Sequence, residues 1–227
     1  MSLLGIFWLI LFLKFKDLRK AMVFSGFLYM FLIVISFFIT KILSYSFNLT
    51  WKYVPDYWNP TTFLNLGEIT GGVAIEDLLF MLFFGGIVTV CYEIFFKKRI
   101  LKSKKNQHRL AIIIFFVSYV VVALINSFNV IYNLIIPSFT TFLIIIIQRK
   151  DLIKHAVYSG LIFLFLYFIG FFIFNLLFPN ALENYWNLSS LSGISVINVP
   201  IEELMYAASF GLMWGPMYEY VKGKKVM

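Results

Sequence analysis

The sequence predicts an all-α integral membrane protein with seven transmembrane helices, and its composition, its apolar runs and the placement of its charges lead to that prediction. Of its 227 residues, 61% are hydrophobic and only 13% are charged, and the mean hydropathy is +0.89. Soluble domains carry about 25% charged residues. The chain is therefore expected to be a multi-pass protein of the cell membrane.

Each predicted helix corresponds to an apolar run, and most runs approach or exceed the roughly 20 residues that a bilayer requires. In chain order, the runs cover residues 2–13, 21–43, 71–96, 110–127, 129–148, 155–178 and 196–220. The first run is short, but its positive charges follow the apolar residues and no small-residue cleavage site appears. We therefore interpret it as a helix and not as a signal peptide.

Lys and Arg are concentrated in every second connection between the runs. Their clusters lie at residues 14–20, 97–109, 148–154 and 222–225. Of the 19 basic residues, 17 fall on one side, and the exceptions are Lys41 and Lys52. The positive-inside rule then predicts an external N-terminus and a cytoplasmic C-terminus. The net charge of +8 is explained by topology and contact with membrane lipid, so no nucleic-acid partner is expected.

Two stretches of the chain are related by an offset of 126 residues. They are "GGVAIEDLLFMLFFGG" at 71–86 and "INVPIEELMYAASFGL" at 197–212. The same offset superimposes the "YE" pair at 92–93 on a second pair at 218–219. The tripeptide "YWN" at 57–59 recurs 128 residues later. Such self-similarity predicts an internal repeat.

The repeat predicts how the single membrane domain, residues 1–227, is organised. A first three-helix repeat is expected at 1–96, a basic loop and linker helix at 97–128, and a second three-helix repeat at 129–227. Because four crossings separate related helices, both repeats should run in the same direction through the bilayer.

Each related stretch carries two adjacent acids in the first turns of its helix, near the outer face. One carboxylate there could serve the helix dipole, an effect of about 0.3–1 kcal/mol. A second acid at lipid depth costs a few kcal/mol that a single cap would avoid, so the repeated pairs favour a catalytic role. The candidate catalytic residues are Glu76, Asp77, Glu202 and Glu203.

Aromatic residues share the helix faces of these acids. Residues three to four positions apart lie on one face, which places Phe80 and Phe83 beside Glu76. Aromatic faces stabilise cations by about 0.5–2 kcal/mol each. A buried acid among such faces could protonate an alkene and shield the carbocation that forms. The candidate substrate contacts are Phe80, Phe83, Tyr206, Phe210, Asn59, Trp58, Trp186 and Asn198, although each tryptophan alone is also typical of an aromatic belt.

Other polar residues favour ordinary roles. Glu93 and Glu219 are expected to form interfacial ion pairs with Lys97 and Lys222. The two histidines, His108 and His155, fall in basic segments and are expected at the solvated surface. No dinucleotide or Walker motif and no Cys/His metal spacing occurs, so no metal or other cofactor is predicted.

The doubled acidic motif resembles that of a known family. "VPIEELMY" at 199–206 and "VAIEDLLF" at 73–80, where Ala74 replaces a proline, resemble the motifs of the membrane lycopene cyclases of the heterodimeric type, here with both halves fused in one chain. The resemblance implies non-redox cyclisation of lycopene or another linear carotenoid to six-membered rings, started by an acid of the two pairs and requiring no cofactor.

Two other functions fit the same residues. A carotenoid hydratase would use the same protonation step and let water capture the cation. A small-solute transporter could be built on a plan of three, one and three helices, although its site would be expected nearer the bilayer midplane. The carotenoid length, the ring type and the oligomeric state stay open, and oligomers are compatible with the sequence.

Overall fold

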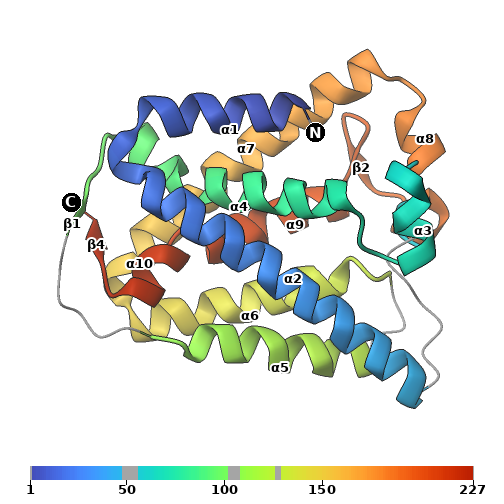
Figure 1. Ribbon diagram of the computed structural model, residues 1–227, viewed down its shortest axis with the longest axis horizontal. Helices are drawn as coiled ribbons and strands as arrows, with labels where there is room; N and C mark the ends of the chain where they lie inside the picture. The colour runs from blue at the N-terminus through green and yellow to red at the C-terminus, as the bar shows by residue number, and fades with distance from the viewer. Residues whose placement is uncertain (1, 48–55, 102–107, 126–128, 227) are drawn as a thin grey trace.

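The computed structural model describes residues 2–47, 56–101, 108–125 and 129–226, and it is helical almost throughout (Figure 1). The α-helices are α1 Ser2–Lys14, α2 Arg19–Phe47, α3 Leu66–Thr70, α4 Ile75–Phe96, α5 Leu110–Ile125, α6 Tyr132–Gln148, α7 Ile153–Leu177, α8 Ala181–Tyr185, α9 Ile201–Trp214 and α10 Met217–Lys222. Short 3-10 turns cover Lys16–Leu18, Phe63–Asn65, Lys150–Leu152 and Leu188–Ser190. The all-α prediction is confirmed.

Two short strand pairs complete the described part of the chain. Strand β1 (Ile100–Leu101) pairs antiparallel with β4 (Lys225–Val226), and β2 (Ser195–Val196) pairs antiparallel with β3 (Val199–Pro200). The first pair ties the segment after α4 to the segment after α10. The second forms a hairpin directly before α9.

Three helical stretches are long and apolar enough to cross a membrane. They are Lys16–Phe47, Ile75–Phe96 and Lys150–Leu177. The helices α1, α5 and α6 are apolar but shorter. Large aliphatic and aromatic side chains are exposed along many of these helices, as expected for surfaces that face lipid. Seven crossings stay a prediction.

The last predicted span, 196–220, is not one helix. Residues 196–200 belong to the hairpin, and the helical part is divided into α9 and α10. Gly215 still donates its N–H to the Gly211 carbonyl over 3.1 Å. Pro216 has no N–H, so the next helical hydrogen bond cannot form and the helix breaks there. The expectation that 196–220 forms one helix is corrected, because a count of apolar residues does not register this local break.

Helix α9 is the centre of the fold and contacts α4, α6 and α7 (Figure 1). Glycines allow the closest helix approaches. A Cβ added at Gly85 would lie 2.9 Å from the Tyr29 Cβ, and one added at Gly211 would lie 3.1 Å from the Phe163 Cβ. Gly85 and Gly211 are separated by the offset of 126 residues that relates the two acidic stretches. The pairs α2–α4 and α7–α9 therefore pack through glycines at related positions.

Gly211→Ala is expected to destabilise the protein by about 1–3 kcal/mol, because overpacking a tight contact forces the helices apart. The new Cβ would lie only 2.9 Å from the Gly160 Cα, which is backbone and cannot turn away. Gly170→Ala is the matched control, since nothing lies within 4 Å of its added Cβ. Thermal unfolding in detergent measures both. Equal melting temperatures for the two variants would contradict the close approach of α7 and α9.

The basic segments lie at one end of the molecule. The turn between α1 and α2, strand β1 and strand β4 lie at that end, whereas α3, α8 and the β2–β3 hairpin lie at the other (Figure 1). Lys52 and residues 102–107 of the basic loop lie outside the described residues. The arrangement agrees with the predicted grouping of positive charge, and the side of the membrane on which it lies stays a prediction.

Candidate active site

The four candidate acids lie in the first turns of α4 and α9, as the sequence predicted. Glu202 and Glu203 are 0% and 3% exposed, and Glu76 and Asp77 are half-buried. Val199 and Pro200, the last residues of the hairpin before α9, are also buried. The second acid pair is thus the more enclosed of the two.

Glu203 is held by three side-chain donors. The hydroxyls of Tyr57 and Tyr167 donate to its two carboxylate oxygens, and the Trp186 Nε1–H donates to Oε1 over 2.8 Å. Burial raises the pKa of Tyr57 well above its usual range, and the nearby Glu203 adds to this effect, so the phenol keeps its proton and donates. Three donors stabilise negative charge on a buried carboxylate.

Aromatic rings surround this carboxylate and extend toward the centre of the fold. The hydroxyls of Tyr206 and Tyr29 lie 2.7 Å apart. The ring of Phe84 lies 5.3 Å from that of Phe210 and stacks on that of Phe80 at 4.6 Å. The predicted contacts Phe80, Tyr206 and Phe210 therefore belong to one aromatic cluster, which both halves of the chain build. Four residues of this site were not identified from the sequence. Tyr29 and Phe84 belong to the aromatic cluster, and Tyr57 and Tyr167 donate to Glu203.

Glu202 and Glu76 each leave one carboxylate oxygen without a hydrogen bond. Glu202 Oε1 accepts from the Ser192 N–H over 2.7 Å and from the Tyr132 hydroxyl over 3.5 Å. Glu76 Oε1 accepts from the Phe63 N–H over 2.6 Å. In both residues Oε2 is buried and has no partner within the described part of the chain. Such an oxygen is available to a proton or to a substrate.

Asp77 and Glu203 occupy related positions but differ in what they bind. Asp77 Oδ2 accepts from the Ala74 N–H over 2.8 Å and closes the first turn of α4. The position related to Ala74 is Pro200, which has no N–H to offer. Glu203 is consequently free of the capping bond and is held by Tyr57, Tyr167 and Trp186. The difference between Ala74 and Pro200 thus explains why Asp77 caps its helix, whereas Glu203 accepts hydrogen bonds from other side chains.

The two "YWN" segments pair with each other. The Asn59 N–H donates to the Tyr185 carbonyl over 2.7 Å, and the Asn187 N–H donates to the Tyr57 carbonyl over 2.9 Å. The rings of Trp58 and Trp186 lie 5.4 Å apart. This pairing brings Tyr57 and Trp186, from distant parts of the sequence, onto Glu203. The recurrence of the tripeptide was the signal that could have identified Tyr57.

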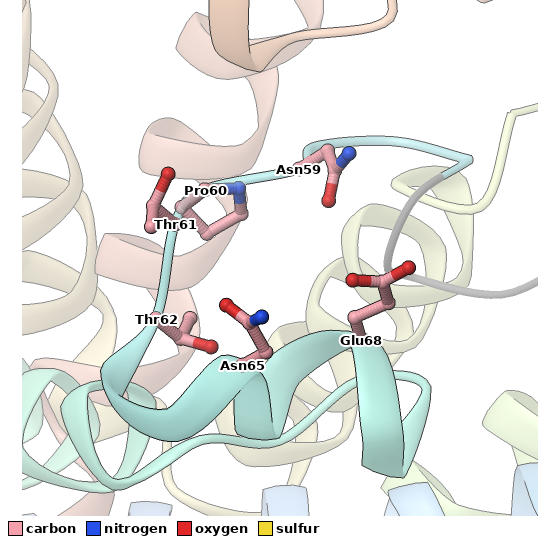
Figure 2. Close-up of a pocket in the computed structure, with 6 residues that line it drawn as sticks. All are labelled: Asn59, Pro60, Thr61, Thr62, Asn65 and Glu68. Atoms are coloured by element: carbon pink, nitrogen blue, oxygen red, sulfur yellow. The ribbon is translucent and has the colours of Figure 1, made fainter.

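Three predicted substrate contacts lie away from the aromatic cluster. The Phe83 ring packs at 5.7 Å from that of Trp8 on α1. Asn198 is an exposed residue of the two-residue turn between β2 and β3, and its positive φ of 59° is one that asparagine tolerates well. Asn59 is exposed and lines a polar hollow of about 150 Å³ (Figure 2). This hollow is lined by Asn59, Pro60, Thr61, Thr62, Asn65 and Glu68.

An apolar groove of about 290 Å³ lies between α7 and the start of α9. Its lining residues are Leu161, Leu164, Phe165, Phe168, Val196 and Leu204. Leu204 directly follows Glu203 in the sequence. Hydrocarbon fits this groove, whereas the polar hollow of Figure 2 offers amides, hydroxyls and a carboxylate that an apolar chain would leave unpaired.

The predictions for three further residues were wrong. Glu93, Glu219 and His155 are 1%, 0% and 2% exposed, so none of them lies at the solvated surface. Lys97 is the C-cap of α4 with a φ of 52°, a left-handed conformation that directs the chain away from the face of Glu93. Lys222 Nζ lies 4.1 Å from the centre of the Phe24 ring. The expected glutamate–lysine pairs are absent from the ion pairs among the described residues.

The apolar helices indicate a helical membrane protein. Its candidate site is a buried, hydrogen-bonded carboxylate surrounded by aromatic rings. The family model described as lycopene cyclase matches residues 1–95 and 129–221. The chain therefore belongs to the lycopene cyclase family, which indicates an enzyme of carotenoid cyclisation with lycopene as its substrate. No curated protein and no solved structure matches the chain.

Proposed function

We propose that the protein cyclises the linear ends of lycopene by acid catalysis at Glu202 and Glu203. A proton added to the terminal C=C bond produces a tertiary carbocation. The inner C=C bond attacks this cation and forms the C–C bond that closes a six-membered ring. A carboxylate then removes a proton from a neighbouring carbon and restores a double bond, so the acid is regenerated, the product is an isomer of the substrate and no redox cofactor is required.

The observation that carries this proposal is the unequal hydrogen bonding of two adjacent buried acids. Glu203 accepts from three donors, which suits a carboxylate that stays ionised and stabilises the cation. Glu202 has one unpartnered oxygen, which suits the acid that carries and donates the proton. The faces of Tyr206, Phe84 and Phe210 would add cation–π stabilisation of about 0.5–2 kcal/mol each.

The first acid pair has a supporting role in this proposal. Asp77 fixes the start of α4 through its bond to the Ala74 N–H. Glu76 has an unpartnered oxygen but binds Phe63 in its own half. Within the described residues, no hydrogen bond joins it to the network of Glu203. The second pair is therefore the reacting pair, and the polyene chain would extend along the apolar groove beside Leu204.

The membrane arrangement belongs to the same proposal. Seven crossings would place the basic end in the cytoplasm and the acids near the outer face. Residues 1–96 and 129–227 would form parallel repeats that meet at the aromatic cluster, as a fused form of a two-subunit enzyme. The contacts of Gly85 and Gly211 at related positions and the pairing of the two "YWN" segments support this arrangement.

Expression of the chain in a lycopene-producing bacterium tests the function. A cyclase yields an isomer of lycopene whose absorption is shifted to shorter wavelength, because the remaining double bond of the end group lies in the ring, where it is twisted out of the polyene plane or moved out of conjugation. A product heavier by one water would indicate a hydratase. Unchanged lycopene, with the protein present in the membrane, would count against both enzymes and favour the transporter.

Glu202→Gln is expected to lower conversion by about 10²- to 10⁴-fold, the usual contribution of a general acid. The amide keeps the shape of the side chain and can still accept from the Ser192 N–H, but it has no transferable proton. Carotenoid products are measured by chromatography at equal membrane levels of protein. Glu76→Gln is the matched variant and should have the smaller effect. Wild-type conversion by Glu202→Gln would remove this acid from the chemistry.

A further inference from the structure

A second cluster of buried ionisable groups lies near the basic end of the protein, at the opposite end of α4 from Glu76. Glu93 comes from α4, His155 from α7 and Glu219 from α10. One ligand atom from each residue can be chosen so that all three lie within 4.8 Å of one another. The cluster contains none of the residues of the proposed active site.

No hydrogen bond satisfies these side chains among the described residues. Both carboxylate oxygens of Glu93, both of Glu219 and both ring nitrogens of His155 are buried without a hydrogen-bond partner. The His155 Nε2 lies 3.5 Å from Glu93 Oε1, and the Nδ1 lies 3.9 Å from Glu219 Oε2. Buried polar atoms in native proteins are normally paired. Six such atoms gathered in one place indicate a binding site for a shared ligand.

Charge balance favours a divalent cation as that ligand. When both carboxyl groups are ionised, two positive charges are needed to balance them, and a protonated imidazole would supply only one. The Arg149 guanidinium donates to the Glu219 backbone carbonyl over 3.3 Å. Its charge is already paired with Asp151 through two bonds of 2.9 Å. A divalent ion would neutralise Glu93 and Glu219 together.

The spacing also suits ligands of one ion. With bonds of about 2.1 Å, two ligands of a tetrahedral zinc ion lie about 3.4 Å apart. The contact of 3.5 Å between His155 Nε2 and Glu93 Oε1 is close to this value. Glu219 lies nearer the other ring nitrogen, 3.9 Å from Nδ1, so its carboxylate would have to move toward Nε2 to complete the set. Imidazole and carboxylate together suit first-row transition metals. The Tyr92 ring stacks on His155 with centroids 4.6 Å apart and restrains the imidazole plane.

We propose that Glu93, His155 and Glu219 bind a divalent transition-metal ion of the zinc type that joins α4, α7 and α10. The ion has a structural role, because its ligands come from three helices at the end of the protein away from Glu203. Glu93 and Glu219 are related by the offset of 126 residues, so the ion would also connect the two halves of the chain. The site is independent of the proposed cyclase activity.

Metal content and stability of the full-length protein test this site. The untagged protein is purified in detergent, stripped with a chelator, incubated with Zn²⁺ and passed through a desalting column. Elemental analysis is expected to find stoichiometric zinc, and the melting temperature should rise, because a ligand that binds only the folded state stabilises it. Co²⁺ in place of Zn²⁺ should give the visible absorption of a cobalt ion bound by nitrogen and oxygen.

Variants identify the ligands. Glu93→Gln, Glu219→Gln and His155→Ala should each lower the affinity for Zn²⁺ by more than about 10-fold, since even loss of an outer-shell partner costs 10- to 100-fold. Glu183→Gln, at an exposed acid on α8, is the matched control and should bind as the wild type does. Wild-type protein that retains no Zn²⁺, shows no cobalt absorption and gains no stability would overturn the proposal, whatever the variants do.

Discussion

Glu203→Gln is expected to abolish the formation of cyclised carotenoid while the protein still accumulates in the membrane. The substitution removes the negative charge that the Tyr57, Tyr167 and Trp186 donors stabilise. It also directs an NH₂ group toward at least one of these donors, because only one end of an amide accepts hydrogen bonds. The cation would lose the negative charge of a carboxylate that is 3% exposed, so product should fall below detection in a lycopene-producing host.

Asp77→Asn is the matched control for this prediction, because Asp77 precedes Glu203 by the repeat offset of 126 residues. The asparagine oxygen can still accept from the Ala74 N–H, so the start of α4 should be preserved at a cost below about 1 kcal/mol. Activity should remain near that of the wild type. If Asp77→Asn were as inactive as Glu203→Gln, the proposal that Asp77 only caps α4 while Glu203 takes part in the reaction would be wrong.

The starts of the two acid-bearing helices could be predicted from sequence because the signal is local. Hydropathy gives the apolar run, and the adjacent acids with Pro200 mark a first turn. The contacts between distant parts of the chain could not be predicted from such local signals. Tyr29 and Tyr167 lie in the middle of apolar helices, and their contacts with Tyr206 and Glu203 depend on how α2 and α7 pack against α9.

The predictions for Glu93 and His155, near the basic end, were wrong because their exposure also depends on contacts that are not local in sequence. Glu93 and Lys97 are four residues apart, a spacing that forms ion pairs only while the helix continues. Helix α4 ends at Phe96, and Lys97 adopts a left-handed conformation, so the pair never shares a face. His155 lies two residues into α7 in a basic segment, yet its ring is buried between α4 and α10. Neighbouring residues in the sequence therefore gave the wrong exposure for these side chains, because helix ends and tertiary packing determine it.

Cutting the chain between residues 103 and 104 is expected to give two fragments that convert lycopene only when they are produced together. The cut lies in the basic loop, outside the described residues, and polar loops tolerate breaks well. The fragment of residues 104–227 contains Glu202 and Glu203 but lacks the Tyr57 donor, the Tyr29 hydroxyl beside Tyr206 and the Phe84 ring.

The fragments should reassociate because the interface between them is extensive and specific. It includes the reciprocal bonds of the two "YWN" segments, the β1–β4 pair and the packing of α4 against α7 and α9. Co-expression of residues 1–103 with 104–227 is therefore expected to restore conversion, and a Tyr57→Phe change in the first fragment should reduce it, since Glu203 then loses one donor. Either fragment alone should leave lycopene unchanged. Full conversion by residues 104–227 alone would place the whole site in the second half, and Tyr29, Tyr57 and Phe84 would then have no part in the chemistry.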